Sequence, residues 1–336
     1  MMENACPENE HPCRTRKVQA TWTWRDHLGA WKMRWGFGRN RYRVQPGLYA
    51  MGLPSPEDPV LVTANYKLTF DVLRRSLAGQ NLWILVLNTH GINVWCAAGK
   101  KTFGTDELVK RIRKHHLGQV VTHKTIIFPQ LGAPGISAHE VQKQTEFRVT
   151  YGPVRASDIQ AFLANEMKAN EQMRTVTFTL RERLAVVPVE LVQALRYFLP
   201  IAIPVVLLSL LGGINLSIAT ALAMLPFLGA ILTGTILFPI LLPVIPLRSF
   251  AAGGWLLGIL YAGGLALFIH AGGWLAATLL LILPPLVSFI ALNFTGATTF
   301  TSLSGVEFEL KRAVPMMVAS AVLGVIAYTG QLILGG

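Results

Sequence analysis

The sequence predicts an α/β domain followed by an all-α transmembrane domain of five helices. Between residues 60 and 167, short apolar runs alternate with segments of helical spacing, a pattern typical of α/β sheets. From residue 197 to residue 247 no side chain is charged. The chain has 30 Lys or Arg and 18 Asp or Glu, and only five of these 48 charged residues lie beyond residue 197. A charged, soluble part therefore precedes an apolar one.

Four apolar runs predict the strands of the first domain. They are Val60–Ala64 (VLVTA), Leu82–Leu87 (LWILVL), 124–128 and 147–151. The continuous apolar run Leu82–Leu87 is typical of a strand that helices cover on both faces. Helices are expected at 69–78, at 105–116, after the capping residue Ser137, and from a Ser157 cap to about residue 167.

Alternation of strands and helices favours a mostly parallel sheet, which binds ligands at the carboxyl ends of its strands. Three loops of this sequence would lie at that end. They are 88–100, 129–137 and 151–157.

The apolar part is predicted to cross a membrane five times, because a spanning helix needs about 20 apolar residues. The expected spans are 194–212, 217–244, 250–269, 273–293 and 313–334, with 212–215 as the first turn. Buried core helices are the alternative interpretation, but runs of this length without a polar face disfavour it.

The charges of the apolar part predict its orientation. All five lie in two expected loops, 245–250 and 294–312, and include Arg248, Lys311 and Arg312. Since Lys and Arg concentrate in cytoplasmic loops, we expect a multi-pass protein of the inner membrane, with the N-terminal domain in the cytoplasm and the C-terminus outside. Residues 1–45 are polar and show no secretory apolar segment.

The expected domains are a basic, Trp-rich tail (1–45), an α/β domain (46–180) and the transmembrane domain (181–336). The net charge is +12, and nine Lys or Arg between residues 14 and 43 are interleaved with four Trp. This composition suggests contact with anionic membrane lipid or an acidic partner. A solvated, disordered tail is the plain alternative, and the spans disfavour nucleic acid.

The segment 93–100, NVWCAAGK, follows the strand Leu82–Leu87 and carries the clearest chemistry. It is not a phosphate loop, because Val94 stands where that motif needs Gly. If Asn93 caps a helix, Cys96 lies in its first turn, where a thiolate is favoured. Ala97, Ala98 and Gly99 leave room for a large flat group. A structural cysteine without a role remains open at this point.

Three cysteines are too few for a disulfide framework or for a four-thiolate iron–sulfur cluster. Cys6 and Cys13 lie in the predicted tail, where we infer no site. We therefore expect no iron–sulfur cluster in this chain.

Four blocks in order resemble the corrinoid-binding domain of corrinoid iron–sulfur proteins. They are ANYKLTFDVLR (64–74), NVWCAAGK (93–100), PQLGAPGISAHEV (129–141) and YGPVRASDI (151–159). The likeness covers about 55–170 and is strongest to the membrane-bound, mercury-methylating branch found in anaerobes. The wider family has a block closer to WAAGK, without the cysteine that Cys96 provides here.

The resemblance implies a Rossmann-like fold that binds cobalamin or a related corrinoid in the base-off form, with Cys96 as catalytic residue and lower axial ligand of cobalt. The implied cofactor contacts are Asn93, Val94, Trp95, Cys96, Ala97, Ala98, Gly99, Lys100, Thr63, Gly132, Gly135, His139 and Gly152. Asn93 would orient Cys96, and the glycines would let backbone approach the ring. The plainer interpretation of Lys100 is a solvated side chain. The plainer interpretation of His139 is an exposed residue on the surface of a helix.

The implied activity is a corrinoid-dependent methyltransferase. It would pass a methyl group from a methyl-folate-type donor, or from another methyltransferase, via methyl-cobalt(III) to mercury(II). A ferredoxin-like iron–sulfur protein would supply electrons, and the basic surface suits an acidic partner. The alternatives are a membrane-anchored corrinoid carrier without catalysis, and methyl transfer to a different native acceptor.

Overall fold

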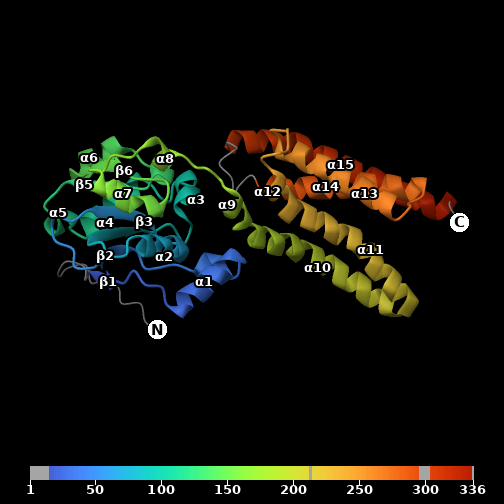
Figure 1. Ribbon diagram of the computed structural model, residues 1–336, viewed down its shortest axis with the longest axis horizontal. Helices are drawn as coiled ribbons and strands as arrows, with labels where there is room; N and C mark the ends of the chain where they lie inside the picture. The colour runs from blue at the N-terminus through green and yellow to red at the C-terminus, as the bar shows by residue number, and fades with distance from the viewer. Residues whose placement is uncertain (1–14, 212–213, 295–302, 335–336) are drawn as a thin grey trace. The chain divides into compact units, whose positions relative to one another are not determined.

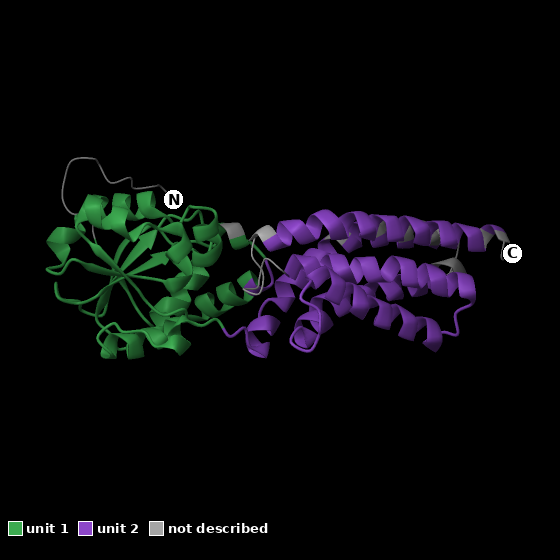
Figure 2. Cartoon of the chain, turned by 90° about the horizontal axis from the view of Figure 1, so that it is seen from above, with its two compact units in different colours: residues 1–33, 37–176 green, residues 34–36, 177–336 purple. Residues whose placement is uncertain are grey.

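A computed structural model describes residues 15–211, 214–294 and 303–334. The chain forms two compact units, coloured separately in Figure 2. Unit 1 comprises residues 1–33 and 37–176, and unit 2 comprises 34–36 and 177–336. Cys6 and Cys13 lie outside the described residues.

Unit 1 is built on a six-stranded mixed sheet in the order β1-β2-β4-β3-β5-β6 (Figure 1). The strands are β1 (Arg16–Val18), β2 (Gly47–Met51), β3 (Val60–Ala64), β4 (Leu82–Leu87), β5 (Thr125–Phe128) and β6 (Arg148–Tyr151). The four predicted strands are confirmed as β3 to β6 and are parallel to one another. The sequence analysis missed β1 and β2, and β2 runs antiparallel to β4.

Helices and short helical turns connect the strands. They are α1 (Trp24–Arg34), η1 (Arg39–Arg41), α2 (Lys67–Ser76), α3 (Val94–Gly99), α4 (Thr105–Lys114), α5 (Leu117–Val120), η2 (Gln130–Gly135), α6 (Ala138–Thr145), η3 (Ala156–Asp158), α7 (Ile159–Ala164) and α8 (Glu171–Arg174). Ser137 caps α6 as expected. The predicted Ser157 cap is wrong, because Asp158 occupies the N-cap position of α7 and Ser157 lies within η3.

Alternate residues of the strands supply two hydrophobic cores, one on each face of the sheet. Val60 and Val62 of β3 pack with side chains of α3, α4 and α6. Leu61, between them, packs with side chains of α2 and α7 on the other face. Both faces are covered, which explains why β3 and β4 read as unbroken apolar runs.

A buried charge cluster joins the N-terminal segment to α2. Asp26 of α1 accepts from Lys67 at 2.6 Å and from Arg74 at 2.8 Å, and Asp71 also pairs with both cations. Burial alone would raise the pKa of Asp26, but hydrogen bonds from Lys67, Thr23 and Arg74 outweigh it and hold that pKa well below its usual range. The described part of the expected tail is thus folded onto the sheet domain.

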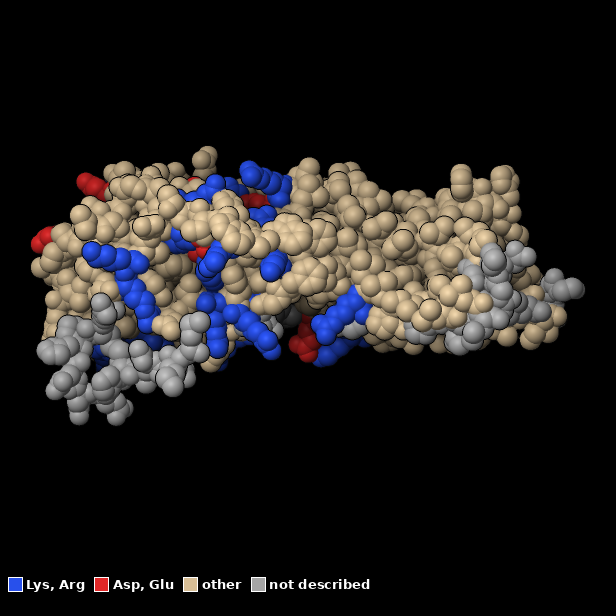
Figure 3. All heavy atoms as spheres, turned by 90° about the horizontal axis from the view of Figure 1, so that it is seen from below, with Lys and Arg blue, Asp and Glu red and all other residues tan. Residues whose placement is uncertain are grey.

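The opposite face of α1 is exposed and carries no acidic residue. Trp24 is 69% exposed, Leu28 41% and Trp31 54%, at helical spacing beside basic residues. In Figure 3, Lys and Arg predominate over Asp and Glu on the visible face of unit 1.

Unit 2 is helical throughout its described elements. They are α9 (Leu180–Leu184), α10 (Val187–Leu211), α11 (Ile214–Leu232), the π-helical turn η4 (Thr233–Leu237), α12 (Phe238–Leu241), α13 (Phe250–Phe268), α14 (Gly273–Asn293) and α15 (Leu303–Leu334). Among the described residues, four helical stretches are long and apolar enough to cross a membrane: Ile218–Leu241, Phe250–Phe268, Gly273–Asn293 and Gly305–Gln331.

Two expectations for the apolar part change. The count of five spans is not confirmed: the first predicted span, 194–212, coincides with α10 up to residue 211, but α10 is not among the four stretches. Residues 303–312, predicted as loop, belong to α15. Their charges lie on a helix because Glu309 and Lys311 are good helix formers and Glu307 pairs with Lys311 at 2.7 Å. Half of the predicted first turn (212–213) and residues 295–302 lie outside the described residues, and the other half of the turn (214–215) belongs to α11.

Candidate functional site

The loop that leads from β4 to α3 is held by one buried amide, Asn65. Asn65 directly follows β3 and is 1% exposed. Its Oδ1 accepts from Thr89 N at 3.0 Å, Thr89 Oγ1 at 2.9 Å and Gly91 N at 2.9 Å. His90 and Gly91 have φ of 57° and 78°; this left-handed conformation is unfavourable for His90 and readily adopted by Gly91. Asn65 therefore fixes the path by which the chain enters α3.

A second contact ties the same loop to α4. Asn88 N donates to Glu107 Oε1 at 2.8 Å, and Asn88 Oδ1 accepts from Asn65 Nδ2 at 3.3 Å. Glu107 is oriented in turn by Arg111, whose Nε lies 2.6 Å from the same oxygen. The end of β3, the end of β4 and the first turn of α4 are thus joined by side-chain hydrogen bonds.

Cys96 lies in the first turn of α3, as predicted. Asn93 is the N-cap residue, and its Oδ1 accepts from Cys96 N at 2.9 Å. Val94, Ala97 and Ala98 face the interior, whereas Cys96 is half-buried. The thiol is free and lies at the border between protein interior and surface.

The rest of the motif opens to solvent. Trp95 is half-buried, and Gly99 and Lys100 are exposed. A side chain added to Gly99 would meet no atom within 4 Å. The surface beside Cys96 is therefore unobstructed on the Gly99 side.

The segment η2 packs directly against α3. A Cβ on Gly135 would lie 2.3 Å from Phe103 O and 3.0 Å from Ala98 Cα, so only glycine fits there. Gly132 is similarly close to the rings of Phe103 and Phe128, at 2.6 and 2.7 Å. These two glycines allow close packing of η2 within the protein, and their expected contact with a corrinoid ring stays a prediction.

Three further predicted contacts lie apart from Cys96. Thr63 is 3% exposed and lies on the same face of β3 as Leu61, which packs on the α2 side of the sheet. Val94 packs on the other side of the sheet, with α4. Gly152 also abuts Ile127 of the α2-side core. The His139 side chain is 86% exposed on α6, with Nδ1 3.8 Å from Glu140. The structure thus brings 93–100 together with Gly132 and Gly135, and the other three remain separate.

A cavity of about 610 Å³ lies at the opposite, amino end of the sheet. It is bounded by the first residues of β3 and β5 and by Asn81, just before β4. His123 lines it, with Nε2 3.0 Å from Asp58 O and Nδ1 accepting from Thr125 N at 3.3 Å. None of the residues that line this cavity belongs to a resemblance block.

Comparison with known proteins identifies the relatives of unit 1. Residues 37–163 match the CO dehydrogenase/acetyl-CoA synthase delta subunit family. This segment holds β2 to β6 and the whole candidate site. The match supports the family-level part of the resemblance and leaves its mercury-methylating branch as a proposal.

Individual relatives give the same result. The acetyl-CoA decarbonylase/synthase complex subunit gamma of Archaeoglobus fulgidus is 29% identical over 135 residues, 40% of this chain and 28% of that protein. The subunit gamma of Methanocaldococcus jannaschii is 29% identical over 129 residues, which are 38% of this chain and 26% of the length of that protein. The chain therefore spans about a quarter of the length of these relatives, and unit 2 lies outside the matching family segment.

The sequence analysis missed Asn65 and Phe103, the residues that organise the site. Asn65 stands in the resemblance block 64–74 immediately after a buried strand, where a polar residue reaches the carboxyl end of the sheet. That position was the available signal. Phe103 gave none, because its contact with the two glycines depends on the packing of η2.

Proposed function

We propose that unit 1 binds a corrinoid at the carboxyl end of its sheet, and that the chain is a corrinoid-dependent methyltransferase with mercury(II) as acceptor. The observation that carries this is the half-buried free thiol of Cys96, capped by Asn93 beside an open surface, within the segment that matches the family. The cofactor would be cobalamin or a related corrinoid, bound base-off.

The residues present fit such a group. Cys96 offers a soft sulfur donor, and transition metals with soft character take thiolate ligands. Gly99 has no neighbour within 4 Å on its Cβ side, so a flat ring meets no steric obstacle there. The hydrogen bonds of Asn65 and Asn93 hold the backbone that carries the thiol. When bound, the corrinoid would supply the cobalt chemistry of methyl transfer, and a thiolate donor from Cys96 would increase the electron density available to a soft acceptor such as mercury(II).

The roles of the chain's own residues follow from these contacts. Cys96 would hold the cobalt of the corrinoid through its sulfur, and Asn93 positions the residue that carries this sulfur through the amide hydrogen bond. Asn65 holds the entry loop, a positioning role that the sequence analysis did not assign. Trp95 and Lys100 lie at the rim of the open surface and would bound the ring there.

The proposed partners are proteins, as the multi-subunit complexes named for the relatives suggest. A ferredoxin-like iron–sulfur protein would deliver electrons, and a methyl-folate or another methyltransferase would deliver the methyl group. The predominance of Lys and Arg on the face of unit 1 in Figure 3 favours an acidic electron donor.

We also propose that unit 2 anchors the protein in the inner membrane with unit 1 in the cytoplasm. The four apolar helices support the anchor, and Arg248, Lys311 and Arg312 support the orientation. With α10 as a fifth span the C-terminus is outside. Labelling of a cysteine introduced at Thr329, near that end, tests this in intact cells: reaction with an impermeant reagent supports five spans, and protection contradicts them.

The decisive experiment replaces Cys96. Cys96→Ala keeps the small side chains of α3, and we expect the fold to persist, since loss of a half-buried thiol costs on the order of 1 kcal/mol. The visible spectrum of the bound corrinoid should change, and methylmercury formation by membranes supplied with mercury(II), a methyl-folate donor and reduced ferredoxin should fall at least about a thousandfold, as for loss of an essential group. Ser or Thr should behave as Ala does, and His should retain only low activity.

Cys6→Ala/Cys13→Ala is the matched control, because it removes the other two thiols and leaves α3 intact. Normal methylation and a normal corrinoid spectrum in Cys96→Ala would exclude Cys96 as ligand. If the natural chain binds a corrinoid but transfers no methyl group, the result would favour a corrinoid carrier without catalysis. Methyl transfer to another thiophilic acceptor, but not to mercury(II), would identify a different native substrate.

A further inference from the structure

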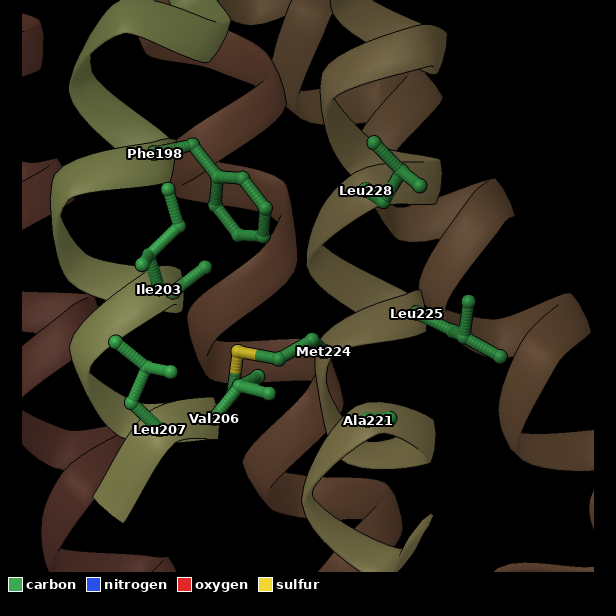
Figure 4. Close-up of a pocket in the computed structure, with 9 residues that line it drawn as sticks. Phe198, Ile203, Val206, Leu207, Ala221, Met224, Leu225 and Leu228 are labelled. Atoms are coloured by element: carbon green, nitrogen blue, oxygen red, sulfur yellow. The ribbon is translucent and has the colours of Figure 1, made fainter. Parts of the chain in front are cut away.

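Two clefts among the described residues of unit 2 differ in chemical character. The cleft between α10 and α11 has a volume of about 370 Å³ and is lined only by apolar residues. Figure 4 shows Phe198 and Val206 of α10 and Met224 of α11 reaching into it. The cleft between α13 and the beginning of α15 measures about 780 Å³ and combines an apolar wall with charged residues. Of these two, the second has polar groups able to select a ligand.

At its charged end, the second cleft includes a carboxylate that contacts the beginning of α13. Glu309 of α15 accepts from Ala251 N at 2.6 Å and from the hydroxyl of Ser249, the N-cap residue of α13. An acidic side chain at this place compensates the unpaired amides of a helix N-terminus. The Glu309 carboxylate is thus occupied within the protein.

Two guanidinium groups line the same end of the cleft. Arg248 directly precedes the α13 cap and is exposed, and Arg312 stacks with its Cζ 4.0 Å from the ring centre of Phe308. Neither arginine forms an ion pair with a carboxylate within residues 15–211, 214–294 and 303–334. Arginine forks of this kind bind phosphate through charge-assisted, paired hydrogen bonds.

The apolar wall continues from this end along the spans. Trp255 and Ile259 of α13 and Met316 of α15 line it. Met316 is seven residues beyond Glu309, which corresponds to about 10 Å along a helix. The cleft therefore presents cations at the end of two membrane-spanning stretches and an apolar wall running into them, the arrangement of a phospholipid with its headgroup at the membrane surface.

We propose that this cleft binds a phospholipid with an anionic headgroup. The phosphate is held by Arg248 and Arg312, and an acyl chain lies along Trp255, Ile259 and Met316. Charge complementarity favours an anionic lipid over a zwitterionic one, since Glu309 is already engaged and the two arginines lack a counter-ion among the described residues.

The test uses the full-length chain in nanodiscs of phosphatidylcholine that contain a minor fraction of phosphatidylglycerol. Native mass spectrometry of the released protein measures which lipid stays bound. We expect phosphatidylglycerol to be enriched on the protein relative to the nanodisc, and Arg248→Gln/Arg312→Gln to lower this preference about tenfold. Soluble glycerophosphoglycerol should not compete, because it lacks the acyl chains that the wall contacts.

Lys311→Gln is the matched control, since Lys311 adjoins Arg312 in sequence but pairs with Glu307 and does not line the cleft. It should leave the preference unchanged. Met316→Trp, which fills the apolar part, should lower retention of both lipids while the arginines remain. No enrichment in the natural chain, an equal loss with Lys311→Gln, or full competition by glycerophosphoglycerol would each overturn the proposal. Cooperative thermal unfolding of each variant shows that it is folded.

Discussion

The two ends of the sheet in unit 1 are built differently, although the same strands supply both. At the carboxyl end, Asn65 collects three donors from the following loop, and η2 packs so closely on α3 that a methyl group on Gly135 would collide with backbone. At the amino end, a cavity of about 610 Å³ remains open. This cavity is thus at the end of the sheet opposite to the family motif. The difference teaches that the candidate site is defined by fixed backbone next to a half-buried thiol.

Replacing one asparagine at each end of the sheet, Asn65 and Asn81, tests this difference. Of the predicted changes in the free energy of unfolding, that of Asn65→Ala should be the largest. Asn65→Ala should lower the free energy of unfolding of unit 1 by about 3 kcal/mol, because it leaves the two buried amides Thr89 N and Gly91 N without their acceptor. Asn81→Ala at the amino end should cost less than about 1 kcal/mol, since it frees only Leu53 N, which is exposed to water. Urea unfolding of the full chain in detergent, followed by hydrogen exchange of the strand amides, measures both. Equal losses would remove the distinction between the ends.

Two glycines within the candidate site sharpen the comparison further. Gly135→Ala should destabilise unit 1 by about 2 kcal/mol, because its Cβ meets Phe103 O and Ala98 Cα. Gly99→Ala should instead stabilise it by about 0.5 kcal/mol, since its Cβ enters open space at the end of a helix. The same unfolding measurement applies. A neutral Gly135→Ala would mean that η2 can move away from α3 at no cost.

The smallest loss of stability within the candidate site concerns the helix cap. Asn93→Ala and Asn170→Ala each remove a side chain that accepts the third amide of its helix at 2.9 Å, and each should cost about 1 kcal/mol. Only Asn93→Ala should alter the rate at which Cys96 reacts with iodoacetamide, because only α3 carries the thiol. An unchanged alkylation rate would show that Asn93 stabilises α3 without positioning Cys96.

The sequence predicted local features well and long-range ones poorly. Strands β3 and β4 were predicted to the residue, because apolar runs end abruptly at Asn65 and Asn88. The cap of α3 was predicted for the same reason, since it needs only Asn93 and Cys96. Strand β1 has three residues, of which two are charged and exposed, and it exists through pairing with β2. No local pattern identifies such a strand.

The site shows the same division. The segment 93–100 was found from its residues and Gly135 from the family resemblance, but the role of Asn65 depends on β3 lying beside β4. In unit 2, the charges of 303–312 were attributed to a loop by the rule that charged residues connect spans. The structure places them on α15, where Glu309 meets the beginning of α13 at a sequence separation of 58 residues.

That separation has a consequence for biosynthesis. At roughly 5–20 residues per second, the ribosome adds Glu309 on the order of 3–12 s after Ala251, the residue whose amide it accepts. During this interval α13 has only its own Ser249 cap. The beginning of α13 therefore reaches its final hydrogen bonding only when α15 arrives, which makes the last helix of the chain a late step in the assembly of unit 2. Chains that terminate before residue 303 should expose this end of α13 to the quality-control proteases of the membrane.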